Sequence, residues 1–111
     1  MSCIPEIIIE GNYFNIARCS HCKRIGLYYK NLLVGFSPKA FEKFSDAFVK
    51  INFDKQALRF PDGDKHIIIN TCHNDIQLNF KEKEFDEMKE MLEQASVLLE
   101  AKNVLDDYKK E

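Results

Sequence analysis

The chain has 111 residues, of which 45% are hydrophobic and 31% charged, so its composition is that of a globular domain and excludes a disordered or low-complexity chain. Sixteen basic against eighteen acidic residues give a formal charge of -2 without any basic stripe, so we expect no nucleic-acid partner. No apolar run approaches the roughly 20 residues that a membrane-spanning helix needs, and no signal peptide is recognisable, so no membrane association is expected. We expect a single domain over residues 1–111.

The first third of the chain is rich in aliphatic and aromatic residues with turn signals between them. It predicts four strands, over residues 6–10, 13–18, 25–29 and 32–36. Gly11-Asn12 forms the first turn, and residues 19–24 form a polar hairpin loop. Lys30-Asn31 makes the third turn, because Asn tolerates a positive φ.

A helix is expected to begin at Ser37-Pro38. The Ser37 side chain can accept a hydrogen bond from the first helical turn, and Pro38 fits the first helical position, where its missing N–H is not needed. Apolar residues then recur at helical spacing, at Phe41, Phe44, Phe48 and Ile51.

The second half repeats this order of elements. Strands are expected over residues 57–60, 66–70 and 76–80, with a turn at residues 61–64 and a polar loop at residues 71–75. A long helix should follow over residues 82–107. Its apolar positions step by three and four, at Phe85, Met88, Leu92, Ala95 and Leu99.

The two halves of the sequence resemble each other. A shift of 44 residues carries Phe36 onto Phe80, and it carries the apolar stripe of the first helix onto that of the second. Chance similarity between amphipathic segments is the alternative to a hairpin-plus-helix duplication. We predict an α+β fold, a single antiparallel sheet of about six strands with two helices packed on one face.

Four cysteines and three histidines carry the most specific chemistry in the sequence. Cys19 and Cys22 form a Cys-x-x-Cys pair in a hairpin loop, the way many small zinc sites begin. The corresponding loop in the second half supplies Cys72 and His73. These four residues are the predicted zinc ligands, and Cys3 or His21 are alternative members of the set.

Two other interpretations of the thiols remain open. In a redox protein, Cys19 would be the attacking thiolate and Cys22 the resolving thiol, although such motifs normally begin a helix. Alternatively, the cysteines are core or half-exposed thiols without a chemical task. Reduced thiols in a chain without a recognisable leader point to the cytoplasm.

The long C-terminal helix suggests a binding surface. Its apolar residues resemble a heptad seam, which makes the helix a candidate for pairing with a second copy or with another protein. The alternative is packing on the chain's own sheet. Its many carboxylates, including Glu84 and Glu87, are interpreted as a solvated face. The sequence lacks a phosphate-binding glycine loop and a recognisable catalytic motif, which favours a non-enzymatic module.

Three segments together resemble a small uncharacterised bacterial family, a domain of unknown function. They are Cys-Ser-His-Cys followed by Ile-Gly-Leu-Tyr-Tyr, the run Pro-Asp-Gly-Asp-Lys-His-Ile-Ile-Ile-Asn-Thr, and Ile-Gln-Leu-Asn-Phe before an acidic helix. The resemblance extends from about Ile16 to Leu99 and implies a bacterial cytoplasmic setting, but no activity or site. We therefore expect a small binding or interaction module. The most specific version of this prediction is a module that zinc stabilises, and a thiol redox protein is the alternative.

Overall fold

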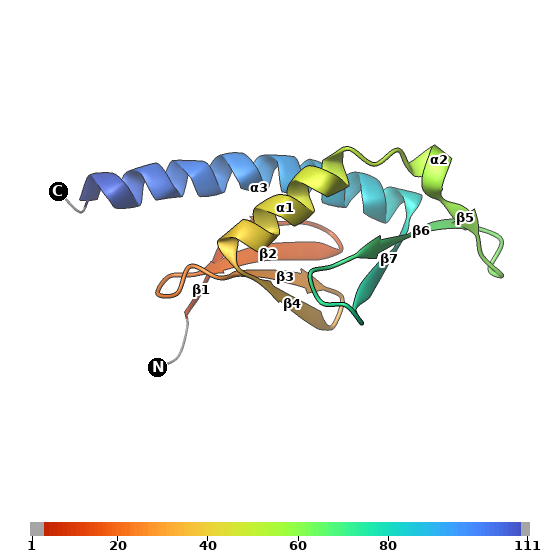
Figure 1. Cartoon of the computed structure of the whole chain (residues 1–111), viewed down its shortest axis with the longest axis horizontal. Helices are drawn as coiled ribbons and strands as arrows, with labels where there is room; N and C mark the ends of the chain where they lie inside the picture. Colours follow the sequence, from red (N-terminus) through yellow and green to blue (C-terminus); the bar gives the residue numbers. More distant parts are fainter. Residues whose placement is uncertain (1–3, 110–111) are drawn as a thin grey trace.

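The computed structural model describes residues 4–109, which form two antiparallel sheets and three helices (Figure 1). The first sheet contains β1 (Pro5–Glu10), β2 (Phe14–Cys19), β3 (Ile25–Tyr29) and β4 (Leu32–Phe36), in that order. The helices α1 (Pro38–Val49) and α2 (Phe53–Gln56) follow. The second sheet, in the order β5-β6-β7, contains β5 (Leu58–Arg59), β6 (Lys65–Asn70) and β7 (Gln77–Lys81), and α3 (Glu82–Lys109) comes last.

The α+β class is confirmed, but the single sheet of about six strands is wrong. The strands divide into a four-stranded and a three-stranded sheet. The sequence pattern shows that each strand has one apolar face, and two sheets satisfy this pattern as well as one. Ile67, Ile69 and Leu78 on the second sheet are buried, while Ile68 between them is 42% exposed.

The first sheet is a meander of tight hairpins. Adjacent strands pair in simple antiparallel register, and an irregularity between Ile7 and Ile9 places Ile8 in the core. The β3–β4 turn lies at the expected residues, but the positive φ belongs to Lys30, at 56°, and not to Asn31. A left-handed lysine is strained, because its Cβ crowds the backbone.

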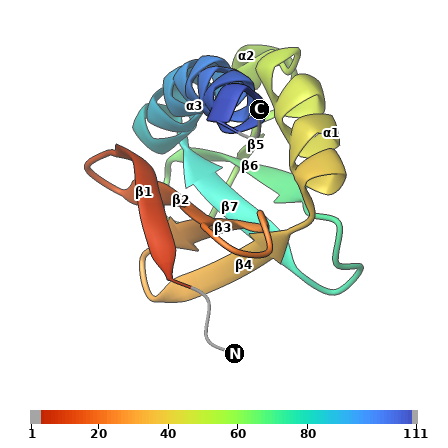
Figure 2. The same cartoon turned by 90° about the vertical axis from the view of Figure 1, so that its left-hand side faces the viewer.

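The helices α1 and α3 lie side by side over one face of the first sheet (Figure 2). The start of α1 is confirmed: Ser37 Oγ accepts a hydrogen bond from Ala40 N at 3.1 Å, and Pro38 is the first helical residue. The single turn of α2 was not predicted from the sequence. Asn52 caps it by accepting a hydrogen bond from Lys55 N, and Phe53 anchors it in the core.

The apolar stripe predicted for the long helix packs inside the molecule. All five of its residues are buried, so this stripe covers the chain's own sheets and does not form an exposed seam: Phe85, Met88, Leu92, Ala95 and Leu99. No helix within residues 4–109 is both long and apolar enough to cross a membrane.

The carboxylate of Glu87 fastens α3 to the β1–β2 turn. Its two oxygens accept hydrogen bonds from the backbone N–H groups of Asn12 and Tyr13, each at 2.9 Å. Gly11 permits this close approach, because a Cβ there would lie 2.5 Å from Met91 Sδ. The interpretation of Glu87 as part of a solvated face is therefore corrected: its side chain satisfies the backbone of a hairpin 75 residues away.

Phe80 of β7 joins the two sheets and α1. Its fully buried ring lies 5.5 Å, centroid to centroid, from the rings of Phe14, Tyr29 and Phe48. Phe36, which the 44-residue shift carries onto Phe80, is equally buried at the end of β4. Phe36 and Phe80 are thus both buried near the end of a strand that precedes a helix. The duplication itself stays a prediction.

A polar cluster fastens the far end of α3 to the first sheet. The buried guanidinium of Arg18 on β2 donates to Asn103 Oδ1 at 3.0 Å and to Asp106 Oδ2 at 3.3 Å. Lys23 Nζ lies 3.2 Å from the same Asp106 oxygen. The pKa of the Asp106 carboxyl is lowered, first by the hydrogen bond from Lys23 and then by the positive charges of Lys23 and Arg18.

Replacement of Phe80 by Ala tests the junction between the sheets. We expect Phe80→Ala to reduce the free energy of unfolding by about 3–5 kcal/mol, because it removes a buried ring and leaves a cavity among three aromatic neighbours. Urea denaturation followed by circular dichroism measures the change. Leu58→Ala, at a side chain that is 68% exposed, is the control and should change stability by less than about 0.5 kcal/mol. Equal losses in the two variants would contradict this packing.

The Asp106 cluster predicts a specific pH dependence. Because the pKa of Asp106 is lower in the folded than in the unfolded chain, its stabilising effect is present above the unfolded pKa and is lost as the pH falls through the folded pKa. Asp106→Asn should therefore be less stable than the parent near neutral pH and lose less stability on acidification. Urea titrations between about pH 6 and pH 2.5 measure this, with Asp107→Asn as the control. Parallel pH profiles for Asp106→Asn and the parent would refute it.

Candidate functional site

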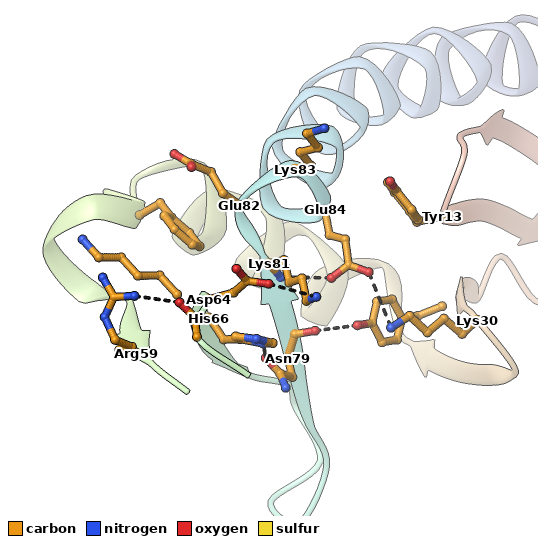
Figure 3. Close-up of a pocket in the computed structure, with 14 residues that line it drawn as sticks. Tyr13, Lys30, Arg59, Asp64, His66, Asn79, Lys81, Glu82, Lys83 and Glu84 are labelled. Atoms are coloured by element: carbon orange, nitrogen blue, oxygen red, sulfur yellow. Dashed lines mark hydrogen bonds and ion pairs between the residues drawn. The ribbon is translucent and has the colours of Figure 1, made fainter. Parts of the chain in front are cut away.

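A cleft of about 840 Å³ opens where the two sheets meet the start of α3 (Figure 3). This volume lies within the range of small-molecule sites in proteins. Its walls come from both sheets, from α2 and from the first turn of α3. The lining residues are Tyr13, Tyr29, Lys30, Phe53, Arg59, Gly63, Asp64, Lys65, His66, Asn79, Lys81, Glu82, Lys83 and Glu84.

Tyr29 connects the two sheets at the floor of the cleft. Its ring stacks on Phe14 with 4.9 Å between centroids, and its hydroxyl donates to the backbone carbonyl oxygen of Asn79 at 2.5 Å. Burial raises the pKa of the Tyr29 hydroxyl, and the charge of Glu84 adds to this effect. The hydroxyl therefore keeps its proton at neutral pH, and its hydrogen bond to Asn79 joins the two sheets.

His66 of β6 lines the cleft and is held by contacts on three sides. Its ring is buried and stacks on Phe60 at 4.3 Å, with Nδ1 at 2.9 Å from Asn79 Oδ1 and Nε2 at 2.8 Å from Asp62 Oδ2. Both ring nitrogens of His66 are therefore hydrogen-bonded to neighbouring side chains. The pKa of the Asp62 carboxyl is lowered, first by the hydrogen bond from the Asp64 backbone N–H and then by the hydrogen bond from His66.

The acidic side chains of the cleft are largely engaged with its own cations. Glu84 accepts a hydrogen bond from Lys81 N at 2.9 Å and lies 3.5 Å from Lys30 Nζ, which corrects its interpretation as part of a solvated face. Asp64 lies 3.2 Å from Lys81 Nζ. Glu82 is the further carboxylate in the lining.

The basic side chains exceed this acidic charge. Lys30 and Lys81 are engaged in the ion pairs just described, while Arg59 donates to the carbonyl oxygen of Gly63 at 2.6 Å, a neutral acceptor. Lys65 and Lys83 are exposed members of the same lining. Five basic against three acidic side chains among the lining residues leave the cleft with a formal charge of +2, before His66 is considered.

The cleft as a whole was not predicted from the sequence. Its members come from segments as far apart as Tyr13 and Glu84, and none of them forms a motif by itself. The sequence features that fall in the cleft are the turn at Lys30 and the run from Asp62 to His66, and both of them predicted only hairpins.

The structure brings Cys19 and Cys22 together in one turn. Cys19, the last residue of β2, is buried, and its Sγ accepts a hydrogen bond from the backbone N–H of the exposed Cys22 at 3.4 Å. Both cysteines line one cavity on the first sheet. His21 is exposed in the same turn, and Cys3 lies outside the described residues.

Cys72 and His73 occupy the loop between β6 and β7. The exposed Cys72 lines a different cavity, beside Ser37 and Phe44. His73 Nε2 lies 3.0 Å from the carbonyl oxygen of Gly35. Within residues 4–109, no three or more His, Cys, Asp or Glu side chains converge as a metal-binding group, so the structure does not join these two residues to the Cys19–Cys22 pair.

The C-terminal half of α3 has an exposed apolar stripe that differs from the predicted one. Its members are at least 42% exposed: Val97, Leu98, Val104, Leu105 and Tyr108. Self-association through the C-terminal helix stays a prediction, and these are the residues on which it would depend.

A family model matches residues 1–108, and its description is "Family of unknown function (DUF6686)". The chain belongs to this family. The resemblance to a domain of unknown function is thereby confirmed, over a longer range than the quoted segments cover. Searches of curated proteins and of solved structures found no match. The family assigns no activity, and nothing in the comparisons supports a redox role for Cys19 and Cys22.

Removal of the Tyr29 hydroxyl tests the connection across the floor of the cleft. We expect Tyr29→Phe to reduce the free energy of unfolding by about 0.5–1.5 kcal/mol, because the ring still packs while one hydrogen bond to the second sheet is lost. Urea denaturation measures the change, with Tyr108→Phe at a 77% exposed position as the matched control. An unchanged stability in Tyr29→Phe would show that this hydrogen bond contributes nothing.

Proposed function

We propose that this protein is a small non-enzymatic binding module whose cleft takes a small organic anion. The observation that carries the proposal is the charge of the lining, in which five basic side chains face three carboxylates. Glu84 and Asp64 are engaged with Lys30 and Lys81, so among the charged lining residues Arg59, Lys65 and Lys83 are balanced only by Glu82. A concave site with excess positive charge attracts anions and raises their local concentration.

The polar groups around the cleft are suited to a phosphate or carboxylate. Arg59 has a planar guanidinium that can bind two oxygens of one anion, and Lys65 and Lys83 supply exposed ammonium groups. The first turn of α3 begins at Glu82, at the same wall. The N-terminus of a helix carries partial positive charge, which adds to that of the lysines and is partly offset by Glu82 and Glu84.

Aromatic side chains provide the apolar part of the lining. Tyr13, at 43% exposed, lies at the opening, and the buried rings of Tyr29 and Phe53 lie below. Most ligand pockets combine such apolar surface with a few fixed polar groups, which set the ligand's orientation. The expected ligand therefore has an anionic end and a flat apolar part.

Titration with phenyl phosphate tests this proposal. At constant ionic strength, phenyl phosphate should bind more tightly than inorganic phosphate or phenol, because it alone engages both the cations and the aromatic wall. Isothermal calorimetry gives the dissociation constants, and NMR chemical-shift changes should locate the ligand near Arg59 and Asn79.

Two paired lysine variants provide the control. Lys65→Ala/Lys83→Ala should weaken phenyl phosphate binding at least about tenfold, the effect of losing one charge-assisted contact. Lys39→Ala/Lys43→Ala removes the same charge from α1, away from the cleft, and should leave the dissociation constant nearly unchanged. Equal effects of the two double variants, or no binding by the parent, would refute the proposal.

A further inference from the structure

An apolar strip runs along the outward side of α3, in the C-terminal part where this helix extends beyond α1 (Figure 1). Its members are all exposed: Val97, Leu98, Ala101, Val104, Leu105 and Tyr108. Leu99, which is buried, is two positions from both Val97 and Ala101, so the strip faces away from the body of the protein. Positions 97, 101, 104 and 108 are spaced by four, three and four, the spacing with which two helices pack along each other. The strip covers about three helical turns, roughly 17 Å.

A row of carboxylates accompanies the strip on the side towards α1. Glu93, Glu100 and Asp107 are exposed and spaced by seven residues, so they lie above one another on the helix. Glu100 is one turn from Ser96, whose hydroxyl oxygen lies 3.4 Å from that of Ser45 in α1. None of the three carboxylates takes part in an ion pair among the described residues. We call Glu93, Glu100 and Asp107 the acidic row.

A cavity of about 640 Å³ lies next to the acidic row, between α1 and α3. Glu100 lines it together with Glu42 and Asp46 of α1, and all three are exposed. Of the basic side chains in the lining, two are bonded to Asp106, as described above, and Lys39 remains. The apolar part of the lining consists of Ile25, Pro38, Phe41 and Leu99. Such a cavity suits a lysine or arginine side chain, which combines an apolar stem with a charged tip.

A second copy of this chain does not supply the cations that the acidic row lacks. Residues 93–108 contain one basic side chain, Lys102, and it is paired with Glu6. In an antiparallel pair of two strips, Glu100 of one chain would also come close to Asp107 of the other, and like charges that face each other destabilise a helix pair. The acidic row would equally be repelled by an anionic membrane surface.

We propose that the strip and the acidic row form a docking surface for a basic amphipathic helix of another protein. The apolar side of that helix would cover the strip, and its lysine or arginine residues would pair with Glu93, Glu100 and Asp107. A contact of three turns is small for a protein interface, so the complex is transient. This surface is independent of the proposed anion cleft, which lies at the other end of α3, around Glu82 and Glu84.

Two labelled synthetic peptides test the charge that the surface prefers. Both are amphipathic helices of about three heptads with leucine at the a and d positions, and their remaining charged residues are lysine in one and glutamate in the other. Fluorescence anisotropy with the full-length protein measures binding. The lysine peptide should bind at least about tenfold more tightly than the glutamate peptide, and added salt should weaken its binding.

A double variant of the strip tests where the lysine peptide binds. Val104→Ser/Leu105→Ser should weaken binding at least about tenfold, because it removes exposed apolar area that the peptide would cover. Both positions are exposed, so the variant should fold, and circular dichroism checks this. Leu58→Ser/Ile68→Ser, which changes two exposed apolar residues of the second sheet, is the matched control and should leave the dissociation constant nearly unchanged.

A second double variant tests the acidic row. Glu100→Gln/Asp107→Asn should weaken binding of the lysine peptide at least about fivefold and reduce its dependence on salt. Asp54→Asn/Asp75→Asn removes the same charge from exposed positions outside α1 and α3 and should have little effect.

Four results would overturn the proposal. The first is equal binding of the two peptides, or no binding of either, and the second is an equal loss in a variant and its matched control. The third is a dimer of the protein alone, seen by sedimentation at about 100 μM, that Val104→Ser/Leu105→Ser dissociates, because a second copy would then cover the strip. The fourth is binding to phosphatidylserine vesicles that the same variant abolishes, because a membrane would then be the partner.

Discussion

The packing of the Phe80 ring is the interaction on which the arrangement of the molecule depends. Within the part of the chain that the structure describes, no backbone ladder joins the two sheets, so side chains must hold them together. Phe80 contacts Phe14 and Tyr29 on the first sheet and Phe48 on α1, and Phe48 in turn stacks on Phe85 of α3 at 4.8 Å. This continuous aromatic core fixes the angle between the sheets. The cleft lies at this junction, because residues of both sheets line it.

Strain and electrostatics coincide at two turns of the first sheet. Among the described residues, the non-glycine residues with positive φ are Lys23 and Lys30. Lys23 lies in the cysteine turn, and Lys30 lies in the cleft, with its ammonium group 5.1 Å above the Tyr29 ring centroid. Each lysine is also paired with a carboxylate of α3, Asp106 and Glu84 respectively. The long helix thus supports both strained turns from one side.

Local features of the fold were predictable from the sequence, and its assembly was not. The strands 25–29 and 32–36, the cap at Ser37 and the buried stripe from Phe85 to Leu99 follow from periodicity and capping chemistry, which act over a few residues. The division into two sheets depends on contacts between distant segments, which periodicity does not encode. The single turn of α2 was too short to have a period.

The candidate sites show the same division between local and distant information. The Cys19–Cys22 pair is recognisable from its spacing, and the structure places both residues in one turn. The hydrogen bond from the Ser20 backbone N–H to the carbonyl oxygen of Ile4, beside this turn, comes from strand register, and a one-residue change in register would reverse which side chains share a face. The charged cleft could not be predicted from the sequence, because it too depends on distant contacts. Residues such as Tyr13 and Lys83 come to line one cleft only after the sheets have packed.

The attachment of α3 to hairpins made much earlier in the chain has a consequence for folding. Glu87 and Asp106 bond to groups 75 and 83 residues before them, so a nascent polypeptide that ends before Glu82 leaves uncovered the part of the core that packs under α3. Contacts of such long range close large loops and slow the search for the native state. We infer that productive folding awaits synthesis of the last helix, and that shortened chains would be prone to aggregate.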